Sequence, residues 1–151
     1  MQDFLGNGLG PTNGLVVFPL ETYVTDPIDL TLVTPGIEII PAKPGHVPFL
    51  VGSTWIIEKA SGTQTSPPTV QGGTNAAHNN VFTSNTSPAN ADVTGATPPS
   101  ISAGVGAAIP SPAAVTANLP VIMDITAGAT GTGTFAVVAR LSVTIAWFAE
   151  G

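Results

Sequence analysis

Hydrophobic residues occupy every second position near the C-terminus of the chain. From Phe135 to Trp147 the odd positions are apolar, while Arg140, Ser142 and Thr144 occupy even positions between them. Successive side chains of a strand point to opposite sides of a sheet, so a period of two predicts a strand with one buried face. A strand this long normally runs through the middle of a sheet, and we expect it to be central.

Two more segments, residues 28–33 and 119–126, alternate in the same way. Their apolar positions, which should share one side of each strand, are Ile28, Leu30 and Leu32 in the first segment and Val121, Met123 and Ile125 in the second. Together with the C-terminal strand and a central apolar run, they predict the following core: Leu30, Leu32, Trp55, Ile57, Val121, Met123, Leu141, Val143 and Ile145.

Other runs of β-branched and aromatic residues are bounded by Pro or Gly, which is typical of short strands. They predict strands at residues 15–18, 22–25, 36–40 and 47–59, with Gly52 marking a bulge or a bend. Residues 61–100 are rich in Thr, Ser, Asn, Gly and Pro, but forty residues without structure are unusual inside a compact domain. We therefore expect short edge strands near residues 69–71 and 80–83, one weak strand within residues 101–117, and a glycine-rich hairpin turn at residues 127–133.

These elements favour an all-β fold. The 17 Gly and 15 Pro interrupt the apolar runs so often that no long helix is expected. Strand spacing alone is compatible with a two-sheet sandwich, a jelly roll or a closed barrel. We predict a jelly-roll-like antiparallel β-sandwich that forms a single domain over residues 15–151.

Residues 1–14 are rich in Gly and contain few apolar side chains, which predicts a flexible N-terminal arm. Its apolar residues Phe4, Leu5 and Leu9 are the candidate interface residues, since they can dock on a neighbouring subunit or on another protein. The alternative is a frayed terminus without a role.

Charge is scarce and unbalanced. The chain has three basic residues against nine acidic ones, a formal net charge of −6, which leaves little to neutralise phosphates and argues against binding nucleic acid. The absence of Cys rules out disulfide bonds and suits assembly in a reducing cytosol. We expect no secretion signal and no membrane association, hence a soluble, unprocessed protein.

The residues that carry acid/base or metal chemistry are sparse. His46 and His78 have no carboxylate at metal-ligand spacing, and Asp26 and Asp29 fit a solvated turn better than a catalytic pair. No Gly-x-Ser-x-Gly elbow and no phosphate-binding loop occurs. We therefore predict no catalytic, cofactor or metal site and no enzymatic activity. An enzyme would need a pocket in which at least two groups converge from the following set: His46, His78, Asp26, Asp29, Glu58 and Asp124.

Two further patterns have structural interpretations. Asp124 and Arg140 lie on the polar sides of strong strands, where a cross-strand ion pair is expected. Trp55, Trp147 and Tyr23 would have to be exposed to stack on sugars, but both tryptophans lie in the most apolar strands and are predicted to be buried.

Several short motifs follow one another in the middle of the chain. The apolar run from Val47 to Glu58 is followed by Pro67-Pro68-Thr69, then by Gly73-Thr74-Asn75 and Asn79-Asn80. This order resembles small virion proteins of tailed phages, and residues 131–149 are similar to the strand that ends such chains. The resemblance implies a jelly-roll cement or decoration protein on the outer surface of an icosahedral capsid, made in the host cytoplasm. Its partners would be the major capsid protein and other copies of itself, with a homotrimer favoured and a homodimer possible. The alternative function is a receptor- or glycan-binding β-domain of a phage fibre or surface appendage.

Overall fold

The computed structural model describes residues 20–106 and 115–149. In chain order, its elements are β1 (Leu20–Val24), β2 (Ile28–Asp29), β3 (Thr34–Ile40), β4 (His46–Ser66), β5 (Thr69–Gly73), β6 (Phe82–Thr86), α1 (Asn90–Val93), β7 (Ser100–Ala103), β8 (Val121–Ala127) and β9 (Thr130–Ala149). The described part of the chain is thus almost entirely β, as predicted.

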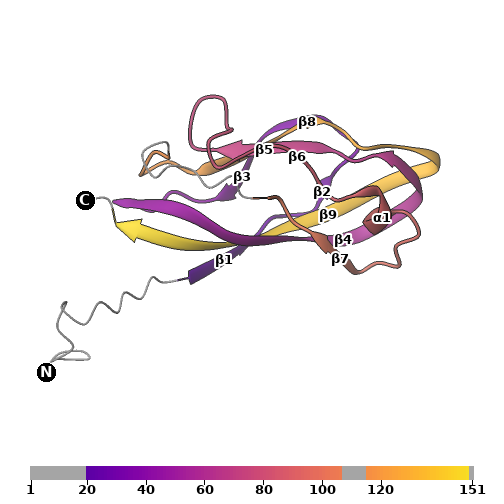
Figure 1. The fold of residues 1–151 in the computed structure, drawn as a ribbon, viewed down its shortest axis with the longest axis horizontal. Helices are drawn as coiled ribbons and strands as arrows, with labels where there is room; N and C mark the ends of the chain where they lie inside the picture. Colours follow the sequence, from indigo (N-terminus) through magenta and orange to yellow (C-terminus); the bar gives the residue numbers. More distant parts are fainter. Residues whose placement is uncertain (1–19, 107–114, 150–151) are drawn as a thin grey trace, which may run out of the picture.

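The strands form two antiparallel sheets that lie one above the other (Figure 1). Sheet A has the order β1-β9-β4-β7, and β2 also pairs with β9. Sheet B has the order β3-β8-β5-β6. β1 and β2 act as one edge strand that is interrupted at Asp26 and Pro27, because proline has no N–H for the ladder.

The connections between the sheets identify a jelly roll. With β1 and β2 taken as one strand, the chain changes sheet at every link except the one from β5 to β6. The first and last strands are neighbours in sheet A, while β3 and β8 are neighbours in sheet B. Eight strands in this double Greek-key order make a jelly roll, which confirms the predicted sandwich class.

Two long strands dominate sheet A. β4 has 21 residues and β9 has 20, and they pair over nearly their whole length. Their register shifts at four places, the first between Leu50 and Gly52, as predicted for a bulge at Gly52. Extra residues in one strand bend a ladder, and the sheet curls along its length (Figure 1).

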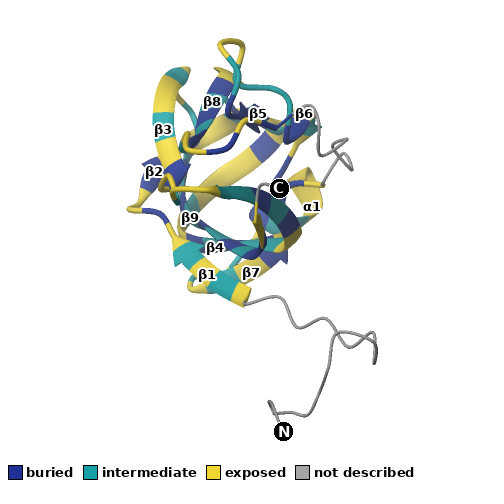
Figure 2. Ribbon diagram, turned by 90° about the vertical axis from the view of Figure 1, so that its left-hand side faces the viewer, coloured by how far each residue is buried: buried dark blue, intermediate teal, exposed yellow. Residues whose placement is uncertain are grey.

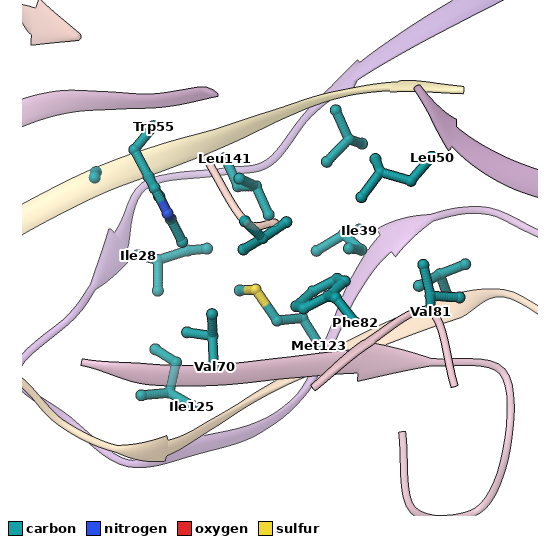
Figure 3. Packing of buried hydrophobic residues seen from close by; sticks show 14 of the residues in the cluster. Ile28, Ile39, Leu50, Trp55, Val70, Val81, Phe82, Met123, Ile125 and Leu141 are labelled. Atoms are coloured by element: carbon teal, nitrogen blue, oxygen red, sulfur yellow. The ribbon is translucent and has the colours of Figure 1, made fainter. Parts of the chain in front are cut away.

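The core fills the space between the two sheets (Figure 3). Eight of the nine predicted core residues are buried, and they are Leu30, Trp55, Ile57, Val121, Met123, Leu141, Val143 and Ile145. The prediction for Leu32 is wrong, because its side chain is 56% exposed. β2 ends at Asp29, whose Oδ1 accepts hydrogen bonds from the Thr31 amide and hydroxyl, so a turn replaces the expected strand.

Three other predictions need correction. Residues 69–73 form β5, which lies between β8 and β6 and is not an edge strand. Residues 127–133 make no hairpin, because β8 and β9 belong to different sheets. The link between them passes so close to the 30–32 turn that a Cβ on Gly128 would lie 2.2 Å from the Thr31 carbonyl oxygen. The weak strand predicted within residues 101–117 is β7 and begins one residue earlier.

The strand predicted at residues 15–18 and the arm at residues 1–14 lie outside the described residues.

Candidate binding face

Among the described residues, one half of the outer side of sheet A carries no charged side chain. Val143 and Ile145 point into the core, so Ser142 and Thr144 between them point outward. Residues directly opposite in an antiparallel pair share a side, which extends the outward set across the sheet. This set, here called the neutral face, consists of Leu20, Thr22 and Val24 of β1, Ser142, Thr144, Ala146 and Phe148 of β9, Val47, Phe49, Thr54 and Ile56 of β4, and Ile101 and Ala103 of β7.

The neutral face presents several large apolar side chains to solvent. Ile101 is 75% exposed, Leu20 is 62% exposed and Val24 is 52% exposed. The rings of Phe49 and Phe148 pack edge to face, with centroids 5.8 Å apart. Exposed apolar residues that gather on one side of a sheet are typical of a surface that contacts another macromolecule.

A charged border ends the neutral face. Arg140 donates from Nε to Glu58 Oε2 at 3.0 Å and from Nη1 to the Thr25 carbonyl at 3.1 Å. The predicted pair of Arg140 with Asp124 is therefore wrong, because Asp124 lies in sheet B. The opposite charges of Arg140 and Glu58 neutralise each other. The two bonds of Arg140 hold its side chain between Glu58 and Thr25.

A second ionic cluster lies at one end of β1. Lys43 Nζ donates to Glu21 Oε2 at 2.6 Å, and the Tyr23 hydroxyl donates to Glu21 Oε1. These two donors, Lys43 first, lower the pKa of Glu21 from 4.5 to about 2. Lys43 also lies 5.1 Å from the ring centroid of Trp147, and His46 contacts the same ring edge to face. His46 is thus part of a packing cluster.

The outer side of sheet B is polar and locally hydrogen-bonded. His78 lies in the loop after β5 and contacts Asp124 Oδ2 through Nδ1 at 3.0 Å, while Asp124 Oδ1 accepts from the Gly36 amide at 2.8 Å. Burial alone would raise the pKa of Asp124, but the hydrogen bonds from Gly36 and His78 outweigh it and lower that pKa. Asp124 therefore fastens the 74–81 loop and β3 to β8. His78 and Asp124 are thus two titratable groups in contact, and their bonds hold the loop and β3 in place. Asp26 and Asp29 also lie together, because both line a groove beside β2.

The remaining candidate residues of the sequence take structural positions. Trp55 is fully buried, Trp147 is 2% exposed and Tyr23 is half-buried, so these three aromatics offer no platform for a sugar. Asp29 accepts the hydrogen bonds that hold the 29–31 turn, where the alternating pattern predicted a strand. Within residues 20–106 and 115–149, no group of three or more His, Asp or Glu side chains is placed to hold a metal ion.

Phe4, Leu5 and Leu9 lie outside the described residues. In the part of the chain that the structure describes, no helix has the length and hydropathy needed to cross a membrane.

The neutral face was not identified from the sequence. A sheet with one solvated side normally carries charges at the outward positions of its strands. In β9, positions 142, 144, 146 and 148 are all uncharged, and in β4 the same holds for positions 47, 49, 54 and 56. That pattern was the available signal, but the pairing of β4 with β9 is needed to see that the two sets form one surface.

Comparisons with known proteins give little similarity. No protein-family model and no curated protein matches the sequence. Among solved structures, a chain described as "Cyanophage Pam1 capsid asymmetric unit" is similar with a TM-score of 0.46 and 13% sequence identity, over 93% of this chain and 89% of that chain.

Proposed function

We propose that this chain is a structural protein of a tailed-phage virion, a decoration protein that binds the outer surface of the capsid and stabilises contacts between major capsid subunits. The neutral face is the observation that carries the proposal. It would be the surface that lies against the capsid.

The physical chemistry of the neutral face favours attachment. Burying charged groups costs far more desolvation energy than burying hydroxyl and methyl groups, so a face of Thr, Ser, Val and Ile can be buried at low cost. The molecule carries a formal charge of −6, but the neutral face contributes none of it. A partner that covers this side of the sandwich therefore has no charge of the neutral face to desolvate.

The architecture favours a contact role in a second way. The face lies on two paired strands of 20 and 21 residues whose opposite sides form the core, which makes it a rigid platform. A rigid surface loses little conformational entropy when it binds. Such a platform suits a protein that adds contact area to an assembly.

The sequence resemblance to phage virion proteins supports the same proposal. In the fold, Pro67 and Pro68 form the corner where the chain leaves sheet A, and Thr69 begins β5 in sheet B. The residues behind the resemblance thus define the sheet crossing of a jelly roll. We propose in addition that the protein self-associates, with a trimer favoured, because sites on a symmetric capsid lattice are grouped around symmetry axes.

The test is binding to phage heads that lack the protein. Ile101→Asp places a charge on the neutral face at a residue that is 75% exposed, and Leu119→Asp places one at a 43% exposed residue outside that face. We expect both variants to keep the melting temperature of the unchanged protein, since exposed substitutions usually change stability by less than about 0.5 kcal/mol.

Occupancy on the heads should fall about tenfold or more for Ile101→Asp and stay unchanged for Leu119→Asp. Equal occupancy for the two variants would contradict the role of the neutral face. If the unchanged protein does not bind the heads at all, the decoration function is wrong. Analytical ultracentrifugation over a wide concentration range tests self-association separately.

A further inference from the structure

A groove of about 480 Å³ lies between the two sheets, on the side where β2 and β3 form their edges. Figure 2 shows β3 and β2 on the same flank of the sandwich, one above the other. The described residues that line the groove all come from residues 25–38. The groove is distinct from the neutral face, which occupies the outer side of sheet A.

The lining of the groove is partly apolar. Ile28 and Ile37 contribute to it from the two edge strands, and Leu32 contributes from the turn between them. Leu32 is 56% exposed, although the alternating pattern of its segment predicts a core residue. Leu32 is therefore an exposed leucine that lines the groove and is not part of the core.

Three carboxylates accompany this apolar lining. Asp26, Asp29 and Glu38 are exposed residues of the groove, and none of the lining residues is basic. The turn that carries Leu32 is fixed, because Asp29 Oδ1 accepts hydrogen bonds from the amide and the hydroxyl of Thr31. The groove thus combines apolar side chains with carboxylates, and its 29–31 turn is held in place by hydrogen bonds.

We propose that this groove binds an extended segment of a partner protein in which a lysine or arginine is flanked by apolar residues. The aliphatic part of such a side chain packs against Leu32 and Ile37, and its charge lies near the carboxylates. β3 is the terminal strand of sheet B, and among the described residues no strand covers its outer edge. An extended segment can therefore add main-chain hydrogen bonds along β3.

The number of free basic residues indicates whether the occupant of the groove is a different protein or a second copy of this chain. The sequence has three basic residues, and two of them are engaged within the molecule, Lys43 with Glu21 and Arg140 with Glu58. A second copy could offer Lys59 alone. A partner with basic residues of its own is therefore the better complement to an acidic groove.

The inference can be tested without capsids, using the full chain labelled with ¹⁵N and NMR chemical shifts as the readout. The probe is the pentapeptide acetyl-Gly-Leu-Arg-Leu-Gly-amide, and its matched control carries neutral citrulline in place of arginine. We expect the arginine peptide to shift the amide signals of residues 25–38. The citrulline peptide should bind about tenfold more weakly, and the difference should shrink in high salt.

Two variants locate the binding charge. Glu38→Gln removes a carboxylate of the groove, and Asp92→Asn removes one outside it, where the Asn oxygen can still accept the hydrogen bond from Ser102. Glu38→Gln should weaken the arginine peptide about two- to fivefold, while Asp92→Asn should leave its affinity unchanged.

Three results would overturn the proposal: no shifts at millimolar peptide, equal binding of both peptides, or shifts confined to other parts of the protein. If the protein alone shows concentration-dependent shifts in the groove that Lys59→Gln abolishes, the occupant is a second copy. Because the probe is a free peptide, failure here leaves the capsid proposal untouched, and failure of capsid binding leaves the groove untouched.

Discussion

The two sheets share one core but present different outer sides. Sheet A is built on two long strands and exposes an uncharged, partly apolar surface. Sheet B is built on strands of five to seven residues and exposes a polar side, where Asp124 holds a loop through His78. Several polar groups of sheet B bond to one another within the chain, whereas the neutral face leaves apolar side chains exposed. The contrast separates a side that stabilises the domain from a side that is available for contact.

The largest effect should come from a charge on the inner side of sheet A. Val143 is fully buried on β9, and Val143→Asp would bury an unpaired carboxylate at a cost of at least about 4 kcal/mol. Thr144→Asp puts the same charge on the neutral face one residue later. We expect the first variant to be largely unfolded by circular dichroism and the second to fold normally. A cooperative, unshifted melting transition for Val143→Asp would show that the inner and outer sides are assigned wrongly.

A smaller effect is expected from the polar side of sheet B. Asp124→Ala removes the acceptor for the Gly36 amide and the partner of His78, which should lower the free energy of unfolding by about 1 to 2 kcal/mol. Urea denaturation measures this loss. Occupancy on capsids should not change, because Asp124 lies outside the neutral face. A variant that keeps its stability but loses capsid binding would reverse the roles given to the two sheets.

The smallest effect concerns acid stability at the end of sheet A. The pKa of Glu21 falls from 4.5 to about 2 on folding, so its bond to Lys43 contributes stability that is complete above pH 4.5 and is lost as the pH falls through 2. The Glu21→Gln variant should therefore lose less stability than the unchanged protein between pH 4.5 and pH 2. Urea denaturation across this window measures the slope, with Glu38→Gln as a control for the loss of one carboxylate. Parallel curves for the unchanged protein and Glu21→Gln would contradict the role of the Lys43 bond.

Strong alternation was sufficient to predict much of the fold. The buried residues of β8 and β9, the central place of β9 and the bulge at Gly52 all follow from local patterns. Leu32 shows where a local pattern fails. The apolar period continues through it, but the bonds of Asp29 to Thr31 turn the chain away from the sheet, and a two-residue strand cannot hold it in register.

The candidate site was less accessible from the sequence than the fold. The predicted interface residues Phe4, Leu5 and Leu9 lie outside the described residues, and their role stays a prediction. The neutral face unites residues of β1, β4, β7 and β9 that lie up to 128 positions apart, from Leu20 to Phe148. No local pattern shows that such residues share a surface.

By itself, the sequence determined the all-β class, the inward and outward positions of its strongest strands, and the scarcity of charge. These properties are local, because side-chain alternation depends only on neighbours along the chain. The tertiary structure decided which strands pair and therefore which ions meet: Arg140 with Glu58 instead of Asp124, and Asp124 with His78. It also decided that the glycine-rich 127–133 segment begins with a link between sheets and that β5 is interior. Strand pairing is set by the burial of a core shared between distant segments, and that burial exists only once the whole domain has closed.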